Sequence, residues 1–170
     1  ELVYFFFAAF TTFQAVYGSD ADGTGDATPW YVQATWFLNS FVPVATLIVF
    51  LLYWVLVYDG GPVGVLSVLM HGGNFLLIIV DFLLARQPFY FSHIYTSVLF
   101  GITYALFTLV YYLAGGTFED GESPYIYSAV DWSSNAKGTG NLLGLIVLLG
   151  VPVLYTTLFC LFAHPCCRSK

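Results

Sequence analysis

Residues 30–58 read WYVQATWFLNSFVPVATLIVFLLYWVLVY, a run without a single charged side chain. A helix needs about 20 apolar residues to cross the hydrocarbon core of a bilayer, at a rise of about 1.5 Å per residue. The run is also too long for the alternating strands of about ten residues that build membrane β-barrels. It therefore predicts a transmembrane α-helix.

The whole sequence has the same character. Of its 170 residues, 59% are hydrophobic, 20% are aromatic and only 8% are charged, whereas an ordinary soluble domain has roughly 25% charged residues. A small protein in water must cover itself largely with polar side chains. The composition therefore excludes a water-soluble domain of this size and predicts an integral membrane protein.

Several further stretches resemble the first, so the sequence predicts an all-α, polytopic transmembrane helical bundle in a single domain. The five expected spans are residues 2–17, 30–58, 63–84, 94–114 and 142–163. Segment 115–140 reads as a loop on the outer face of the membrane. The first stretch is as short as a truncated span would be, and we expect six spans in the complete protein.

The few basic residues predict the orientation of the bundle. Arg86 follows the third span and Arg168 and Lys170 follow the fifth, which places all three on one face, whereas Lys137 lies on the other. Basic residues are enriched in cytosolic loops. We therefore expect the C-terminus to lie in the cytosol, in a membrane that the sequence does not identify.

Charge and cysteine usage limit the partners and cofactors. The formal net charge of −6 argues against a nucleic-acid partner. The histidines and cysteines lack the spacing of a metal site, and we expect neither metal nor cofactor. Cys166 and Cys167 follow the last span, where reversible palmitoylation and unmodified thiols remain open alternatives. Membrane lipids, and other membrane proteins, are the expected partners.

Polar side chains inside the third and fourth spans form the candidate site, because a polar group in hydrocarbon is costly unless it is satisfied. One face of the third span carries His71, Asn74 and Asp81 at helical spacing. One face of the fourth span carries Ser97, Gly101, Tyr104 and Thr108. The step from Ser97 to Gly101 permits close helix packing. We expect the two polar stripes to meet.

His71 is the candidate general base, or a ligand-binding group in an intramembrane pocket. Asn74 lies one turn away and can orient the ring, whereas Asp81 lies about 15 Å along the helix axis and cannot. The alternative is a structural histidine whose ring is hydrogen-bonded by Thr108 or Tyr104. The sequence leaves both interpretations open.

Several segments that are not simply hydrophobic resemble one family of membrane proteins. They are LMHGGN at 69–74 with Asp81, YALF at 104–107, GG at 115–116 and YIYSAVDW at 125–132. Together they resemble the rolling stone proteins, a branch of the superfamily that also holds the androgen-induced gene product and the androgen-dependent TFPI-regulating protein. The likeness covers most of the chain from about Phe41 to Trp132.

The resemblance implies a six-helix bundle with both termini in the cytosol. In the androgen-induced members it also implies an intramembrane hydrolase that cleaves fatty acid esters of hydroxy fatty acids, using a threonine nucleophile and a histidine. His71 matches that histidine, and the threonine would fall just before Glu1. Rolling stone itself is associated with myoblast fusion.

Two functions follow as hypotheses. The first is a lipid ester hydrolase, in which a threonine hydroxyl activated by His71 attacks an ester that arrives from the bilayer. The second is a non-catalytic membrane subunit or an adhesion or fusion protein, which binds other membrane proteins through its acidic outer loop.

Overall fold

The computed structural model describes residues 1–18, 28–58, 60–85, 87, 89–117 and 121–162. These residues form helices joined by turns, with no strand among them, which confirms the all-α fold. The helices are α1 (Leu2–Tyr17), α2 (Trp30–Asn39), α3 (Val42–Leu52), α4 (Val65–Ser67), α5 (Asn74–Ala85), α6 (Ile94–Leu113), α7 (Trp132–Leu145) and α8 (Val151–Phe162). Three π-helical turns lie at Tyr53–Val57, Val68–Gly73 and Ile146–Gly150, and short 3₁₀ turns lie at Phe91–His93 and Ser128–Val130.

These elements combine into longer helical segments, called rods here, and four of them overlap the last four expected spans. Four rods are long and apolar enough to cross a membrane: Trp30–Val57, Val65–Ala85, Phe91–Leu113 and Trp132–Phe162. Helix α1 is apolar but shorter, as its sequence indicates. The last rod begins at Trp132, so the end of segment 115–140 is helical, where the sequence predicted a loop.

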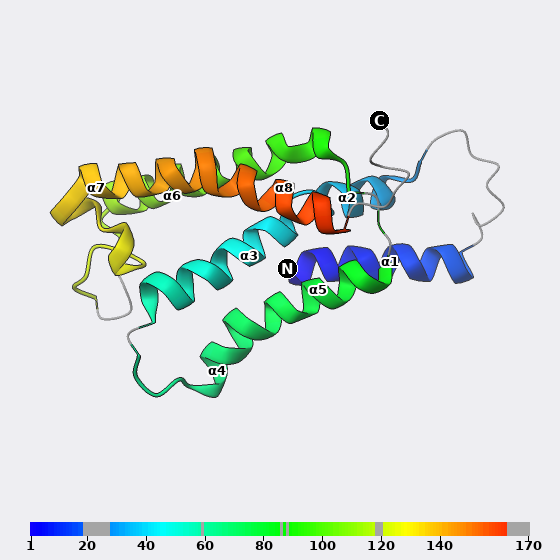
Figure 1. Cartoon of the computed structure of the whole chain (residues 1–170), viewed down its shortest axis with the longest axis horizontal. Helices are drawn as coiled ribbons and strands as arrows, with labels where there is room; N and C mark the ends of the chain where they lie inside the picture. The colour runs from blue at the N-terminus through cyan, green and yellow to red at the C-terminus, as the bar shows by residue number, and fades with distance from the viewer. Residues whose placement is uncertain (19–27, 59, 86, 88, 118–120, 163–170) are drawn as a thin grey trace.

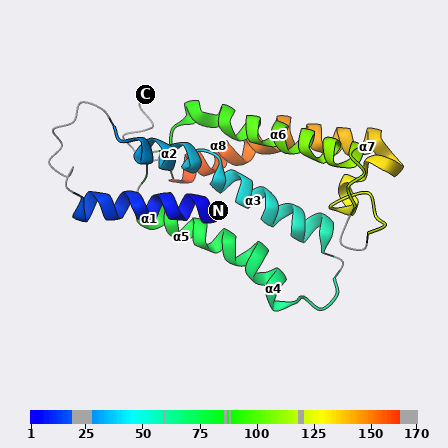
Figure 2. The same ribbon diagram turned by 180° about the vertical axis from the view of Figure 1, so that it is seen from behind.

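Helix α3 is the central helix of the bundle. Figures 1 and 2 show it between α5 on one side and the α6–α8 pair on the other. Its buried residues lie in its first half, whereas the π-helical turn that continues it has none. The helices therefore pack closely around the start of α3 and separate towards its end.

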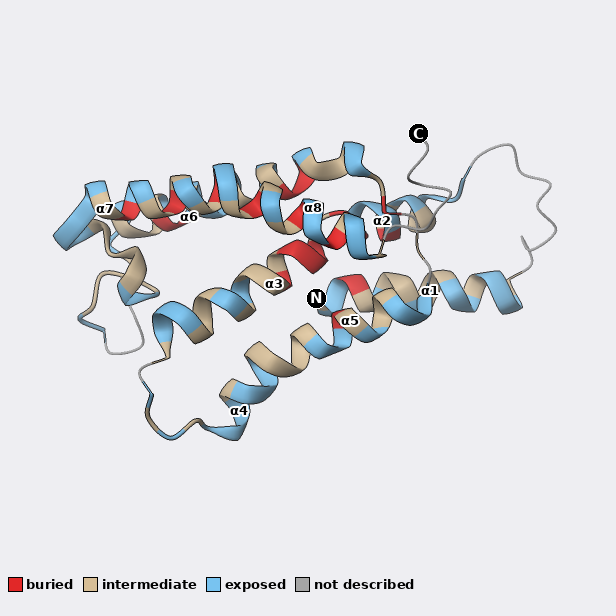
Figure 3. Ribbon diagram, in the orientation of Figure 1, coloured by how far each residue is buried: buried red, intermediate tan, exposed pale blue. Residues whose placement is uncertain are grey.

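The packed core consists of two hydrophobic clusters near the start of α3. One joins Val44 to Phe89 and to the α8 residues Val151, Tyr155 and Leu158, and the other joins Val42 to Tyr4 and Ile78. Much of the outer helix surface is exposed, as Figure 3 shows by colour, and many of its exposed side chains are large and hydrophobic. Apolar outer surfaces are what a bundle covered by lipid requires.

A break in the first long rod sets the position of α3. Pro43 lacks the N–H that an unbroken helix would donate to a carbonyl one turn earlier, and the chain turns between α2 and α3. The Ser40 carbonyl accepts a hydrogen bond of 3.1 Å from Ser97 Oγ on α6. The Ser40 and Thr96 hydroxyl oxygens lie 2.9 Å apart. Such donors from a neighbouring helix are what makes a broken helix tolerable in hydrocarbon.

A second polar contact joins α1 to α2 and α5. The fully buried Tyr4 donates its hydroxyl to Asp81 Oδ2, and the Tyr4 hydroxyl oxygen lies 3.4 Å from Asn39 Oδ1. We call Tyr4, Asn39 and Asp81 the Tyr4 cluster. Intramembrane carboxylates usually pair inside the bundle, and Asp81 is thus engaged in helix packing.

The start of α7 is capped by Asp131. Its carboxylate accepts hydrogen bonds from the backbone N–H groups of Ser133 and Ser134 at 2.8 and 3.3 Å, and from both serine hydroxyls at 2.6 Å. These bonds, those of the serine side chains first, lower the pKa of Asp131 from about 3.8 to about 2. The cap explains why a segment rich in serine, asparagine and glycine begins a helix here.

The Ser97 contact gives a first test. Replacing Ser97 with alanine removes the side-chain donor to Ser40, and we expect a loss of about 1 kcal/mol of stability, within the range measured for interhelical hydrogen bonds. Thr103→Ala is the matched control, because its hydroxyl bonds only the Leu99 carbonyl of its own helix in the contacts seen here, at 2.9 Å. Equal losses in both variants, measured by unfolding in detergent, would contradict this role of Ser97.

The Asp131 cap gives a pH-dependent test. Because the pKa is lowered in the folded protein, the ionised carboxylate stabilises the fold above about pH 4, and this contribution disappears as the pH falls through about 2. We expect Asp131→Ala to reduce thermal stability at neutral pH and the difference from wild type to shrink between those two pH values. Asp131→Asn, which keeps a capping oxygen, should lose less. A difference that stays constant with pH would contradict the assignment.

Candidate functional site

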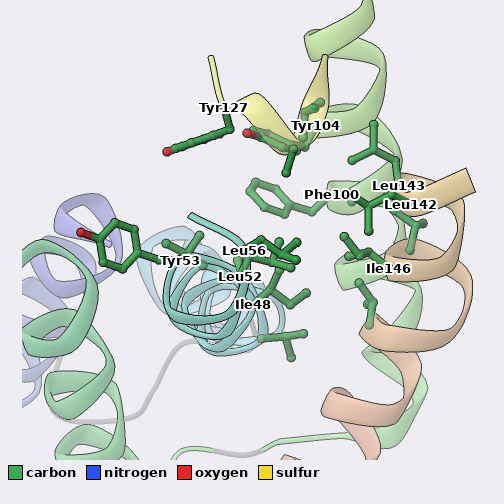
Figure 4. Close-up of a pocket in the computed structure, with 18 of the residues that line it drawn as sticks. Ile48, Leu52, Tyr53, Leu56, Phe100, Tyr104, Tyr127, Leu142, Leu143 and Ile146 are labelled. Atoms are coloured by element: carbon green, nitrogen blue, oxygen red, sulfur yellow. The ribbon is translucent and has the colours of Figure 1, made fainter. Parts of the chain in front are cut away.

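A cavity of about 260 Å³ lies where α3 separates from α6 and α7. Its walls come from α3, α6, α7, the start of α8 and all three π-helical turns, and residues 127, 129 and 130 of the connecting segment cover one end. Figure 4 shows the rings of Tyr53 and Tyr127 on one side and Leu142 and Ile146 on the other. Nearly all of the lining is aliphatic or aromatic, as in sites for apolar ligands.

All three π-helical turns contribute to this cavity. Tyr53 and Leu56 come from the first turn, His71 from the second, and Ile146 and Val147 from the third. A π-helical turn places an extra residue in the helical register, and such turns are frequent at functional sites. The convergence of three of them marks the cavity as the candidate site.

His71 lines the cavity and stacks flat on Tyr53. The two ring centroids are 3.7 Å apart and the ring planes differ by 8°. The Nδ1 atom of His71 is buried and has no hydrogen-bond partner among the described residues. The ring is therefore held in its plane by stacking, and Nδ1 is enclosed by the protein without a polar partner in the described ranges.

The predicted partners of His71 are engaged elsewhere. Asn74 donates its side-chain N–H to the Met70 carbonyl at 2.7 Å. Thr108 donates to the Ala105 carbonyl at 2.8 Å and accepts from Trp132 Nε1 at 3.2 Å. Neither the expected orienting amide nor the expected structural hydroxyl is hydrogen-bonded to the ring.

The two polar stripes do not pack directly against each other, because α3 lies between α5 and α6 (Figures 1 and 2). His71, Ser97 and Tyr104 do line the same cavity, so part of each stripe reaches one site. Asp81 belongs instead to the Tyr4 cluster. The expectation that both stripes form one site is thus correct only for the residues near the cavity.

The close approach expected at Gly101 is present. A β-carbon at this position would lie 3.0 Å from Val147 Cγ2 and 3.7 Å from Val151 Cγ2. A β-carbon here would therefore require the Val147 side chain or α6 to shift by a few tenths of an ångström. Gly101 keeps these two walls of the cavity in contact.

The cover over the cavity is held by contacts at the start of α7. Thr139 donates to the Asp131 carbonyl at 2.8 Å, and the bond from Trp132 to Thr108 joins the same region to α6. Asp131 directly follows the 3₁₀ turn Ser128–Val130, which supplies two residues of the cover. Part of segment 115–140 therefore covers the cavity.

Two predictions fall on residues outside the described ranges. These residues are the palmitoylation candidates Cys166 and Cys167, and the basic residues Arg86, Arg168 and Lys170 that orient the C-terminus. Lys137 is exposed on α7. Within the described ranges no cluster of His, Cys, Asp or Glu side chains is suited to hold a metal ion. Orientation and lipidation stay predictions.

Sequence reasoning missed Tyr4, Asn39 and Ser40, which are all buried. Asn39 and Ser40 are adjacent polar residues inside a long apolar run, followed by Pro43. That combination indicates a break in a membrane helix whose freed backbone groups are hydrogen-bonded by other parts of the protein. Tyr4 carries no such signal, because a tyrosine in an apolar run is also typical of a lipid-facing anchor.

Comparison with known proteins assigns the family. The family model described as "Protein rolling stone" matches residues 4–166. Protein rolling stone of Drosophila melanogaster is 30% identical over 118 residues, which cover 67% of this chain and 42% of that relative. The chain thus spans less than half the length of this relative, and no solved structure matches it. The resemblance seen in the sequence is confirmed, and the chain belongs to the rolling stone family of integral membrane proteins.

Proposed function

We propose that the protein binds a lipid in the cavity beside α3 and hydrolyses an ester of that lipid, with His71 as the general base. The observation that carries the proposal is an apolar intramembrane cavity with an imidazole in its lining, whose Nδ1 atom has no partner among the described residues. A base acting on a lipid ester needs a ring nitrogen that no protein group occupies.

The rim of the cavity supports entry from the bilayer. Leu56, Phe100 and Tyr104 line the cavity and remain 42%, 43% and 38% exposed. They lie within rods long and apolar enough to span the membrane, so the exposed parts of the rim face lipid. A lipid can therefore reach the cavity laterally, without passing through water.

The chemistry requires a nucleophile besides His71. In the proposal this is the threonine that the family resemblance implies upstream of Glu1. Its hydroxyl oxygen forms a bond to the ester carbonyl carbon while its proton passes to His71. The ester C–O bond then breaks and His71 returns the proton to the leaving alcohol. Water releases the acid from the acyl-threonine in a second, similar step.

Stacking on Tyr53 supports this role of His71. A base must be held in one orientation to take a proton efficiently. The flat stack at 3.7 Å restricts rotation of the imidazole out of its plane. It replaces the hydrogen bond that usually orients a catalytic histidine.

One observation favours a second candidate, a lipid-binding protein without catalysis. Neither a carboxylate nor the Asn74 amide is bonded to the His71 ring within the described ranges. In this alternative the imidazole only binds the polar end of the lipid, and partner proteins use the remaining surface. Both candidate functions include lipid binding, and only the first includes hydrolysis of the lipid.

Replacing His71 separates them. In the full-length protein in nanodiscs, we expect His71→Ala to lower hydrolysis of a labelled fatty acid ester by about a hundredfold or more, the usual size of a general-base effect. His93→Ala is the matched control, because His93 contacts Tyr90 and Tyr95 and does not line the cavity. Hydrolysis unchanged by His71→Ala would reject catalysis, and a lipid still captured by a photoreactive probe would then favour the second candidate.

Covalent labelling gives an independent test of the nucleophile. We expect a serine/threonine hydrolase probe to modify the full-length protein and a lipid ester to compete with it. The modification should weaken in Tyr53→Leu, which removes the stacked ring from His71. Stable co-purification with another membrane protein, together with no adduct in the wild type, would instead support the non-catalytic candidate.

A further inference from the structure

We infer that the cavity selects its lipid by the length of one acyl chain, whose methyl end lies at a closed floor and whose polar end lies at a mouth lined by tyrosines. The inference rests on the proposed lipid binding and adds the number, direction and length limit of the chains. The floor is formed by Val44, Val147 and Val151. The mouth is formed by Tyr53, His71 and Tyr104, beside the cover that carries Tyr127.

The dimensions of the cavity indicate a single chain. Its lining on α3 and the following turn extends from Val44 to Val57, which is about 20 Å at the rise of a helix. A cavity of about 150 Å³ holds one benzene molecule, so about 260 Å³ spread over that length is narrow. It fits one extended chain and is too slender for a sterol or for two chains side by side.

Burial and polarity give the direction of the chain. Val44, Val147 and Val151 at the floor are 1%, 6% and 1% exposed. Ser97 also lies at this end, but its hydroxyl is donated to the Ser40 carbonyl. Hydroxyl and imidazole groups otherwise gather at the mouth, where Tyr104 is 38% exposed, and at the adjoining cover, where Tyr127 is 39% exposed. An ester or carboxyl group therefore finds partners only at the mouth.

The floor cannot readily move to admit a longer chain. Val44 and Val151 belong to one buried cluster with Phe89, Tyr155 and Leu158. The contact at Gly101 holds α6 against Val147. Close-packed interiors do not stretch to fit extra methylene groups without cost. A chain longer than the cavity must therefore leave part of its length outside or bend.

Filling the deep end of the cavity tests the length limit. Ala45 lines the cavity next to Val44, and Ala45→Phe places a ring in the space for the methyl end. Leu51→Phe is the matched control, because Leu51 is on the same helix, is exposed and does not line the cavity. Ala45→Leu is a milder variant that keeps the test valid if the phenylalanine prevents folding.

The readout is competition for a photoreactive fatty acid on the full-length protein in nanodiscs, with octanoate, dodecanoate and hexadecanoate at equal mole fraction. We expect Ala45→Phe to lower the ratio of hexadecanoate to octanoate binding by roughly fivefold or more, the lower end of what overpacking costs. Leu51→Phe should leave the ratio unchanged. Equally weaker binding of all three fatty acids, or an unchanged ratio, would overturn the length limit and leave the proposed lipid binding in place. Failure of every fatty acid to bind the wild type would reject the proposed function as well.

Discussion

Every backbone carbonyl that a helix break exposes within a bilayer must find a donor inside the protein, and the break between α2 and α3 meets this demand through Ser97. The hydroxyl of Ser97 reaches the Ser40 carbonyl from α6, and Tyr4 joins Asn39 and Asp81 on the opposite side. These bonds hold the start of α3 at the centre of the bundle. The other end of α3, which has no buried residue in its π-helical turn, separates from α6 and α7. The cavity occupies that separation.

The polar residues of the membrane interior thus divide between two tasks. Those at the start of α3 bind one another and the backbone, so they leave little capacity for a ligand. Those at its end, His71 and Tyr104 among them, line the cavity. The π-helical turns strengthen this division, because they interrupt the regular register only around the cavity. The closely packed region around the start of α3 makes the bundle rigid. The region around the end of α3 holds the cavity, and the packed region limits how deep the cavity is.

Much of this could be predicted from the sequence, and the exceptions have physical causes. Long apolar runs predicted the helices and the membrane class, because few structures other than a membrane-spanning helix suit an uncharged run such as residues 30–58. The choice of His71 as a cavity residue needed only the cost of a polar group in hydrocarbon. Its neighbours could not be predicted, because spacing along α5 and α6 does not reveal that α3 lies between them. The break at Ser40 had a local signal in Pro43, but its donor came from a distant part of the chain.

The central claim is that one lipid chain lies in the cavity beside α3 with its methyl end at the valine floor. The most direct measurement is photo-crosslinking of the full-length protein with a fatty acid that carries a diazirine at its methyl end, followed by mapping of the adducts by mass spectrometry. The account predicts adducts on Val44, Ala45 and Val151. Adducts confined to outward-facing residues such as Leu51, Val80 and Leu83 would contradict it.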